Sequence, residues 1–81
     1  MKNQLVLKDI GRRIREIRKA RNMTQAELAD RMGVSSQTIS YVESGKKAIR
    51  PENLINLTNV LNISTDYILK GKRRLWWKIS I

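Results

Sequence analysis

Residues 24–45 read TQAELADRMGVSSQTISYVESG, two short helix patterns joined by a very short turn. Thr24 is predicted to cap the first helix, because Glu27 lies three residues later, at the spacing of a capping box. Gly33 is expected to end this helix, since glycine takes a positive φ without strain. Ser35 is then predicted to cap a second helix that ends at the next glycine. Two helices so close in sequence must cross steeply.

The second of these helices has two unlike faces. Ile39 and Val42 are expected to point into the core, and the small Ala29 lets the two helices approach closely. The opposite face carries only small polar or amphipathic side chains, namely Ser36, Gln37, Ser40 and Tyr41. The spacing predicts a helix-turn-helix. An ordinary helical corner without a ligand meets the same constraints and stays open as the alternative.

The first helix is predicted to follow a short N-terminal arm. Three isoleucines recur at i, i+4 and i+7 after Asp9, whose carboxylate can accept backbone N–H bonds as a cap. The helix is therefore expected over residues 10–21 and the arm over residues 1–9.

The remaining patterns are also helical. Pro51 suits the first turn of a helix, and leucines at helical spacing mark its inner face. Ser64 is placed to cap a short last helix that Gly71 ends. The sequence thus predicts an all-α fold of five helices, with a domain over residues 10–71 and a basic, Trp-containing tail over residues 72–81.

Composition limits the function. The 81 residues carry 17 Lys and Arg against seven Asp and Glu, and neither Cys nor His occurs. Disulfides, thiolate metal sites and imidazole chemistry are thereby excluded, and we expect no enzyme, metal or cofactor. The net charge of +10 favours a polyanion, either nucleic acid or an anionic membrane surface. No apolar run approaches a membrane span, so a cytoplasmic protein is the simplest expectation.

Three runs of this chain resemble a known family. They are TQAELA at residues 24–29, S-x-x-T-I-S-x-x-E-x-G at residues 35–45 and STDYILKG at residues 64–71. Together they are similar to the DNA-binding domain of the lambda and 434 phage repressor–Cro family, also called the XRE family. The resemblance implies a five-helix lambda repressor-like DNA-binding domain. It also implies a sequence-specific transcriptional regulator of double-stranded DNA, a repressor of phage or bacterial type.

The resemblance also implies roles for single residues. The base-reading positions are Ser36, Gln37, Tyr41 and, more weakly, Ser40. Gln37 is the strongest of these, because its carboxamide can form two hydrogen bonds with adenine. The candidate phosphate contacts, at the helix ends and in the following basic loop, are Thr24, Gln25, Ser35, Ser44, Lys46, Lys47 and Arg50. Each of these residues has a solvated surface side chain as its alternative.

Arg18 and Glu43 match a pair that forms an internal salt bridge in relatives, which implies a structural role in positioning the second helix of the motif. Arg18 as one more exposed basic residue is the alternative. Arg12, Arg13 and Arg15 face either DNA or solvent, and the sequence leaves this open.

The tail departs from the family pattern. LWWKISI, residues 75–81, has strand-like composition, and two adjacent Trp side chains favour a covered position. Helix-turn-helix proteins bind two half-sites as twofold dimers, so a homodimer on a twofold-symmetric operator is expected. Its candidate contacts are Leu75, Trp76, Trp77 and Ile79. A tail without fixed structure and a membrane-surface segment are alternatives. A second function class, a protein-interaction module such as an antitoxin or adaptor, would depend on this tail rather than on Gln37.

Overall fold

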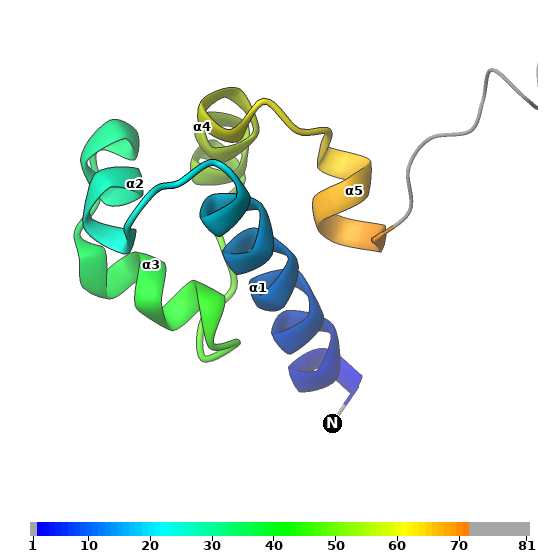
Figure 1. Cartoon of the computed structure of the whole chain (residues 1–81). Helices are drawn as coiled ribbons and strands as arrows, with labels where there is room; N and C mark the ends of the chain where they lie inside the picture. Colours follow the sequence, from blue (N-terminus) through cyan, green and yellow to red (C-terminus); the bar gives the residue numbers. More distant parts are fainter. Residues whose placement is uncertain (1, 72–81) are drawn as a thin grey trace, which may run out of the picture.

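Five helices make up residues 2–71, the part of the chain that the computed structural model describes, and no strand occurs there. They are α1 (Lys2–Ala20), α2 (Gln25–Met32), α3 (Ser36–Glu43), α4 (Pro51–Leu61) and α5 (Thr65–Lys70). In Figure 1, α1 runs through the middle, with α2 and α3 on one side and α5 on the other. α1 packs against α3 and α5, and α2 packs against α3 and α4. The all-α prediction is confirmed.

The first helix begins at Lys2, eight residues before its predicted start. The prediction of a cap at Asp9 and of an arm is therefore wrong for residues 2–9. Asp9 lies inside α1, where its carboxylate is 3.8 Å from the Arg12 guanidinium. No Gly or Pro interrupts residues 2–10, and the backbone of Lys8 packs closely against Gly45 in the loop after α3. This tertiary contact favours continuation of the helix over a local cap.

From Thr24 onward, the predicted helix caps and ends are confirmed except for the end of α3. Thr24 and Glu27 form the capping box, with the Thr24 Oγ1 accepting from the Glu27 N–H at 3.0 Å and the Glu27 carboxylate accepting from the Thr24 N–H at 2.8 Å. Ser35 and Ser64 cap α3 and α5 through their hydroxyl oxygens. Gly33 takes a left-handed φ of +70° at the turn. α3 ends at Glu43, slightly earlier than expected.

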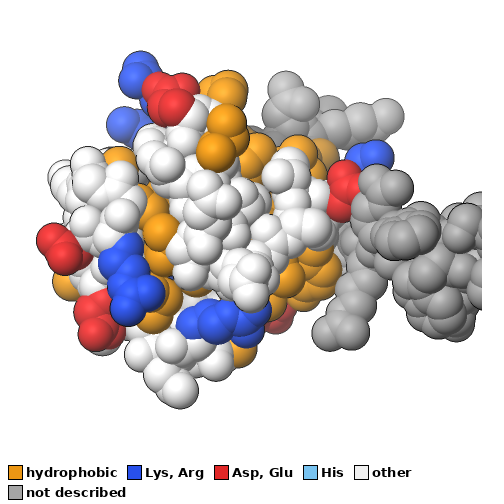
Figure 2. Space-filling view, turned by 90° about the horizontal axis from the view of Figure 1, so that it is seen from above, with side chains coloured by type: hydrophobic (Ala, Val, Ile, Leu, Met, Phe, Trp, Pro, Cys, Tyr) orange, Lys and Arg blue, Asp and Glu red, His pale blue; other side chains and the backbone are white. Residues whose placement is uncertain are grey.

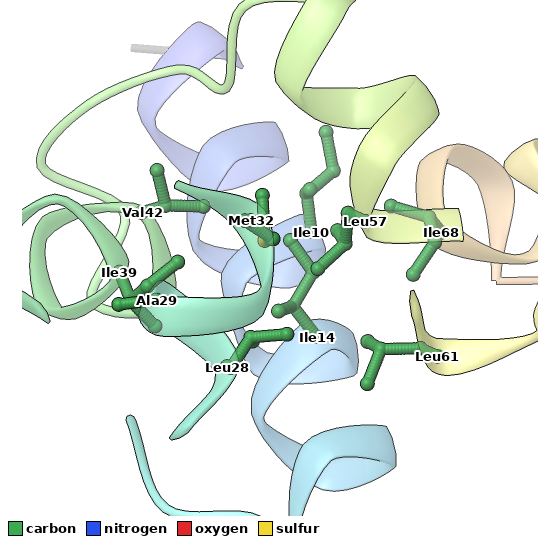
Figure 3. Packing of buried hydrophobic residues seen from close by; sticks show 10 residues of the cluster. All are labelled: Ile10, Ile14, Leu28, Ala29, Met32, Ile39, Val42, Leu57, Leu61 and Ile68. Atoms are coloured by element: carbon green, nitrogen blue, oxygen red, sulfur yellow. The ribbon is translucent and has the colours of Figure 1, made fainter. Parts of the chain in front are cut away.

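All five helices contribute to one hydrophobic core (Figure 3). Its buried members are Ile10, Ile14, Leu28, Ala29, Met32, Ile39, Val42, Leu57, Leu61 and Ile68. Ala29 of α2 and Ile39 of α3 come from the two helices of the predicted motif, and both are almost fully buried. The core therefore consumes the inner face of α3 and fixes which face remains outside.

Gly11 lies where α1 closely approaches the end of α3. A Cβ at this position would lie 2.5 Å from the carbonyl oxygen of Glu43 and would also overlap that of Val42. Glycine inside a helix is unfavourable relative to alanine by about 0.5–1 kcal/mol, so its presence here needs a packing reason. Only a residue without a side chain allows α1 to touch the carbonyl end of α3.

We expect Gly11→Ala to lower the free energy of unfolding by about 1–3 kcal/mol, because overpacking outweighs the gain in helix propensity. Chemical denaturation measures the change. Arg15→Ala, on the exposed side of the same helix, is the control and should stay within about 0.5 kcal/mol of the wild type. A stabilised Gly11→Ala protein would contradict this packing.

Because of the capping box, the stability of the folded protein should decrease at low pH. The backbone N–H of Thr24, and then its side chain, hold the pKa of Glu27 below the ordinary value of 4.5. A lowered pKa in the folded state contributes stability above the unfolded value and loses it as the pH falls through the folded value. Glu27→Gln does not titrate, so its thermal midpoint should fall less between neutral pH and pH below 4.5 than that of the wild type. Parallel curves would contradict the assignment.

Candidate nucleic-acid interface

The outer face of α3 carries the four side chains expected to read bases. Ser36 and Gln37 are exposed in the first turn, while Ser40 and Tyr41 are half-exposed one turn later. On the opposite side, Ile39, Val42 and Glu43 are buried. The turn at Gly33 and the core hold the helix so that its polar face points outward.

Gln37 and Tyr41 are joined within this face. The Gln37 Nε2 donates to the Tyr41 hydroxyl at 2.7 Å, across one helical turn. An amide nitrogen carries two hydrogens and its carbonyl oxygen accepts. Gln37 therefore retains one N–H and the Oε1, which are the two groups that a bidentate contact with adenine requires. Tyr41 limits the directions in which they point.

Basic side chains gather around the Tyr41 ring. The Nζ atoms of Lys46 and Lys47 lie 5.9 and 5.4 Å from the ring centroid, within the range of cation–π attraction. The backbone N–H groups of the same lysines donate to the Tyr41 carbonyl at 2.9 and 3.3 Å. Two ammonium groups are thus held at the carboxyl-terminal end of α3.

Arg18 and Glu43 form a buried, bidentate ion pair between α1 and α3. Arg18 Nε donates to Glu43 Oε2 at 2.6 Å and Arg18 Nη2 to Glu43 Oε1 at 3.0 Å, with side chains only 8% and 3% exposed. Arg18 Nη1 donates to the Met23 carbonyl at 2.7 Å. Among the described residues every buried side-chain polar atom has a partner. The pair joins α1, the start of α2 and the end of α3.

Gln25 belongs to this network as well. Its Nε2 donates to Glu43 Oε1 at 3.0 Å, and the side chain is half-buried. A side-chain contact from Gln25 to phosphate would have to come from the second N–H of the same nitrogen. The sequence did not indicate this internal bond, because Gln25 and Glu43 lie far apart along the chain.

The hydroxyl groups that were expected to contact phosphate differ in whether their hydrogen is already used in a hydrogen bond within the domain. The oxygens of Thr24 and Ser35 accept from backbone N–H groups as helix caps, and the Ser35 hydroxyl also forms a hydrogen bond of 2.9 Å with the Thr38 hydroxyl, in which either can donate. Ser44 instead donates its hydroxyl hydrogen to the Tyr41 carbonyl at 3.1 Å. A hydroxyl has one hydrogen, so Ser44 can give none to a phosphate without breaking this bond. Arg50 is exposed at the start of α4 and lies 3.7 Å from Glu52.

The arginines in α1, and Arg21 just after it, have mostly structural partners. Arg13 donates to the carbonyl oxygens of Ile68 and Leu69, and Arg21 donates to that of Leu61. Both therefore bind the ends of helices whose last carbonyls lack intrahelical partners. Arg12 pairs with Glu16 on the exposed side, and Arg15 is exposed. No local pattern marks Arg13 and Arg21, since their acceptors lie 40 or more residues away.

Charge on the face over α4 is mixed. Figure 2 shows basic and acidic side chains scattered there among uncharged ones. Within residues 2–71 no helix is long and apolar enough to cross a membrane, and no group of three acidic side chains is placed to hold a metal ion. Leu75, Trp76, Trp77 and Ile79 lie outside the described residues, so their role as dimer contacts stays a prediction.

A helix-turn-helix family model matches residues 14–68 of the chain. Because this match covers more than half of the 81 residues, the chain belongs to the helix-turn-helix family. Within that family it is of the lambda/434 repressor–Cro, or XRE, type, as its resemblance implied.

Two solved structures share this fold. The crystal structure of the P22 c2 repressor protein in complex with synthetic operator 9T has a TM-score of 0.75 at 41% identity, covering 78% of this chain and 96% of that one. The restriction-modification controller protein C.AhdI from Aeromonas hydrophila has a TM-score of 0.73 at 29% identity, covering 76% and 94%. The five-helix, lambda repressor-like prediction is confirmed.

The chain is also similar in sequence to repressors and to HTH-type transcriptional regulators. Repressor protein C2 of Salmonella phage P22 is 42% identical over 62 residues, covering 76% of this chain and 29% of that protein. The uncharacterized HTH-type transcriptional regulator y4mF of Sinorhizobium fredii is 35% identical over 66 residues, covering 82% and 87%. The chain spans 51% of YqaE and 56% of YonR, two HTH-type regulators of Bacillus subtilis, or about half of each.

Removal of one partner of the ion pair should lower the free energy of unfolding more than replacement of both partners by apolar residues. Glu43→Ala leaves Arg18 buried without its carboxylate, so we expect the free energy of unfolding to fall by about 3–5 kcal/mol. The double variant Arg18→Met/Glu43→Leu should recover most of that loss, because replacing a buried pair by apolar groups is often neutral. Chemical denaturation of the three proteins checks this. A double variant as unstable as Glu43→Ala would contradict it.

Proposed function

We propose that this chain is a sequence-specific, double-stranded DNA-binding transcriptional regulator, a repressor, that reads the major groove with α3. The observation that carries the proposal is the division of α3 into a buried face fixed by Ile39, Val42 and Glu43 and a protruding polar face. Small polar side chains keep a helix slim enough for the major groove. The similar P22 c2 repressor was crystallised with a synthetic operator, which supports the same use of the fold here.

Gln37 is the proposed main base-reading residue. Its Oε1 and remaining N–H can pair with adenine N6 and N7, and the bond to the Tyr41 hydroxyl restrains the carboxamide before DNA arrives. Ser36 lies beside it in the first turn, and Ser40 and Tyr41 extend the same face. The Tyr41 ring could contact a thymine methyl group.

Phosphates are proposed to meet the two ends of α3 and the start of α2. Lys46 and Lys47 supply charge at one end, Ser35 lies at the other, and Gln25 and Thr24 offer donors at the N-terminus of α2. Arg50 extends this set along the loop. Ser44 belongs to this set only if its hydroxyl hydrogen exchanges the Tyr41 carbonyl for a phosphate oxygen.

The finer assembly follows from the geometry of such proteins. Helix-turn-helix proteins bind as twofold dimers whose half-sites lie about one DNA turn apart. We therefore infer a homodimer on a twofold-symmetric operator, in the cytoplasm, without catalytic activity of its own.

In vitro selection from a random duplex library at near-physiological salt tests the proposal. We expect a recovered motif with twofold symmetry and half-sites about one turn apart. Only weak, salt-sensitive binding without enrichment would contradict it. A function as an antitoxin or adaptor, with a protein as the partner, would then be the better account.

The selected operator then allows a matched test of Gln37. Gln37→Ala should remove roughly 1–3 kcal/mol of discrimination at one base pair per half-site while leaving nonspecific binding nearly intact. Tyr41→Phe breaks the same hydrogen bond but keeps the carboxamide, so it should retain most of the discrimination. Lys46→Ala should instead weaken all duplexes and lower the salt slope by about one. Equal loss on every sequence for Gln37→Ala would exclude base reading by this residue.

A further inference from the structure

An apolar groove lies at the surface of the domain beside the loop that joins α3 to α4. It has a volume of about 270 Å³ and is bounded by α1, the loop before α4, the start of α4 and the end of α5. Its walls include Leu7, Ile10, Ile49, Pro51, Leu54 and Leu69. Lys47 is its one charged wall residue among those described. Leu69 is 38% exposed, so apolar surface remains open to water here.

The sequence that follows α5 has an apolar edge of matching chemistry. In an extended segment, successive side chains point to opposite sides, so residues 75–81 would present two different edges. One side would carry Leu75, Trp77, Ile79 and Ile81, and the other Trp76, Lys78 and Ser80. The first set is wholly apolar, whereas the second has a charge and a hydroxyl. An extended segment of this pattern buries one edge and leaves the other in water.

The groove is within reach of this segment. Leu69 forms part of its wall, and α5 ends one residue later, at Lys70. Gly71 then takes a left-handed φ of +72°, which turns the chain out of the helical direction. An extended chain advances about 3.3–3.6 Å per residue, so Trp77 can lie up to about 20 Å from Gly71. That span is ample for a groove whose wall begins two residues before Gly71.

We infer that the groove is the docking site of this chain's own tail, with Leu75, Trp77 and Ile79 lying in it and Trp76 facing water. Trp77 is the largest of the three and would bury the most apolar area. The short connection favours the chain's own groove over that of a second copy, since joining by a few residues gives a millimolar effective concentration. The docked tail would bridge α1, α4 and α5 next to the basic loop. This inference does not rest on the proposed function.

Fluorescence of the full chain tests the docking directly, because Trp76 and Trp77 are its only tryptophans. Trp76→Phe leaves Trp77 as the reporter, and Trp77→Phe leaves Trp76. We expect Trp77 to emit at shorter wavelength than a free tryptophan amide and to be quenched several-fold less by acrylamide. Trp76 should resemble the free amide in both respects.

Substitution of a residue that lines the groove tests whether the fluorescence of Trp77 depends on this groove. In the Trp76→Phe protein, Leu69→Gln should shift the emission toward that of the free amide and restore quenching. Ile55→Gln is the matched control, because Ile55 is 62% exposed on α4 and lies outside the groove. Circular dichroism verifies that both variants keep their helices.

Three results would overturn the inference. The first is full exposure of both tryptophans, and the second is equal protection of both. The third is a blue shift that disappears on dilution together with a dimer seen by sedimentation, which would assign the groove to the tail of a second copy. A blue shift of Trp77 that persists in the monomer and is lost in Leu69→Gln supports docking within one chain.

Discussion

Arg18 and Glu43 meet where α1, the start of α2 and the end of α3 come together, and both charges are buried there. A buried charge is strongly unfavourable unless it is paired and fully hydrogen-bonded. The Arg18 fork, the Met23 carbonyl and the Gln25 amide meet that demand in one arrangement of the three helices. The direction in which the polar face of α3 points therefore depends on this pair.

The same end of α3 is held by close backbone packing as well as by charge. Gly11 brings α1 against the carbonyls of Val42 and Glu43, and Gly45 brings the following loop against Lys8. The longer α1 thus acts as a rigid support on which the end of α3 and the basic loop rest. Such a support lets small side chains on α3 keep defined positions, which a contact with base edges requires.

Some of the basic residues have structural partners, and others are exposed. Arg13 and Arg18 on α1, and Arg21 just after it, bind carbonyl or carboxylate oxygens within the domain, whereas Lys46 and Lys47 stand over the Tyr41 ring at the surface. The planar guanidinium suits fixed oxygen pairs, while the strongly hydrated ammonium group stays near water. The net charge of the chain therefore overstates how many cations are free for a polyanion.

Local patterns were enough to predict the helices from Thr24 onward and the two faces of α3, because caps, glycines and apolar spacing act over only a few residues. They failed at α1, where a local cap signal at Asp9 was outweighed by packing of Lys8 against Gly45. The need for a residue without a side chain at Gly11 and the hydrogen bond from Gln25 to Glu43 became visible only in the folded domain. Each of these joins residues distant in the chain, and such contacts exist only after the helices have packed.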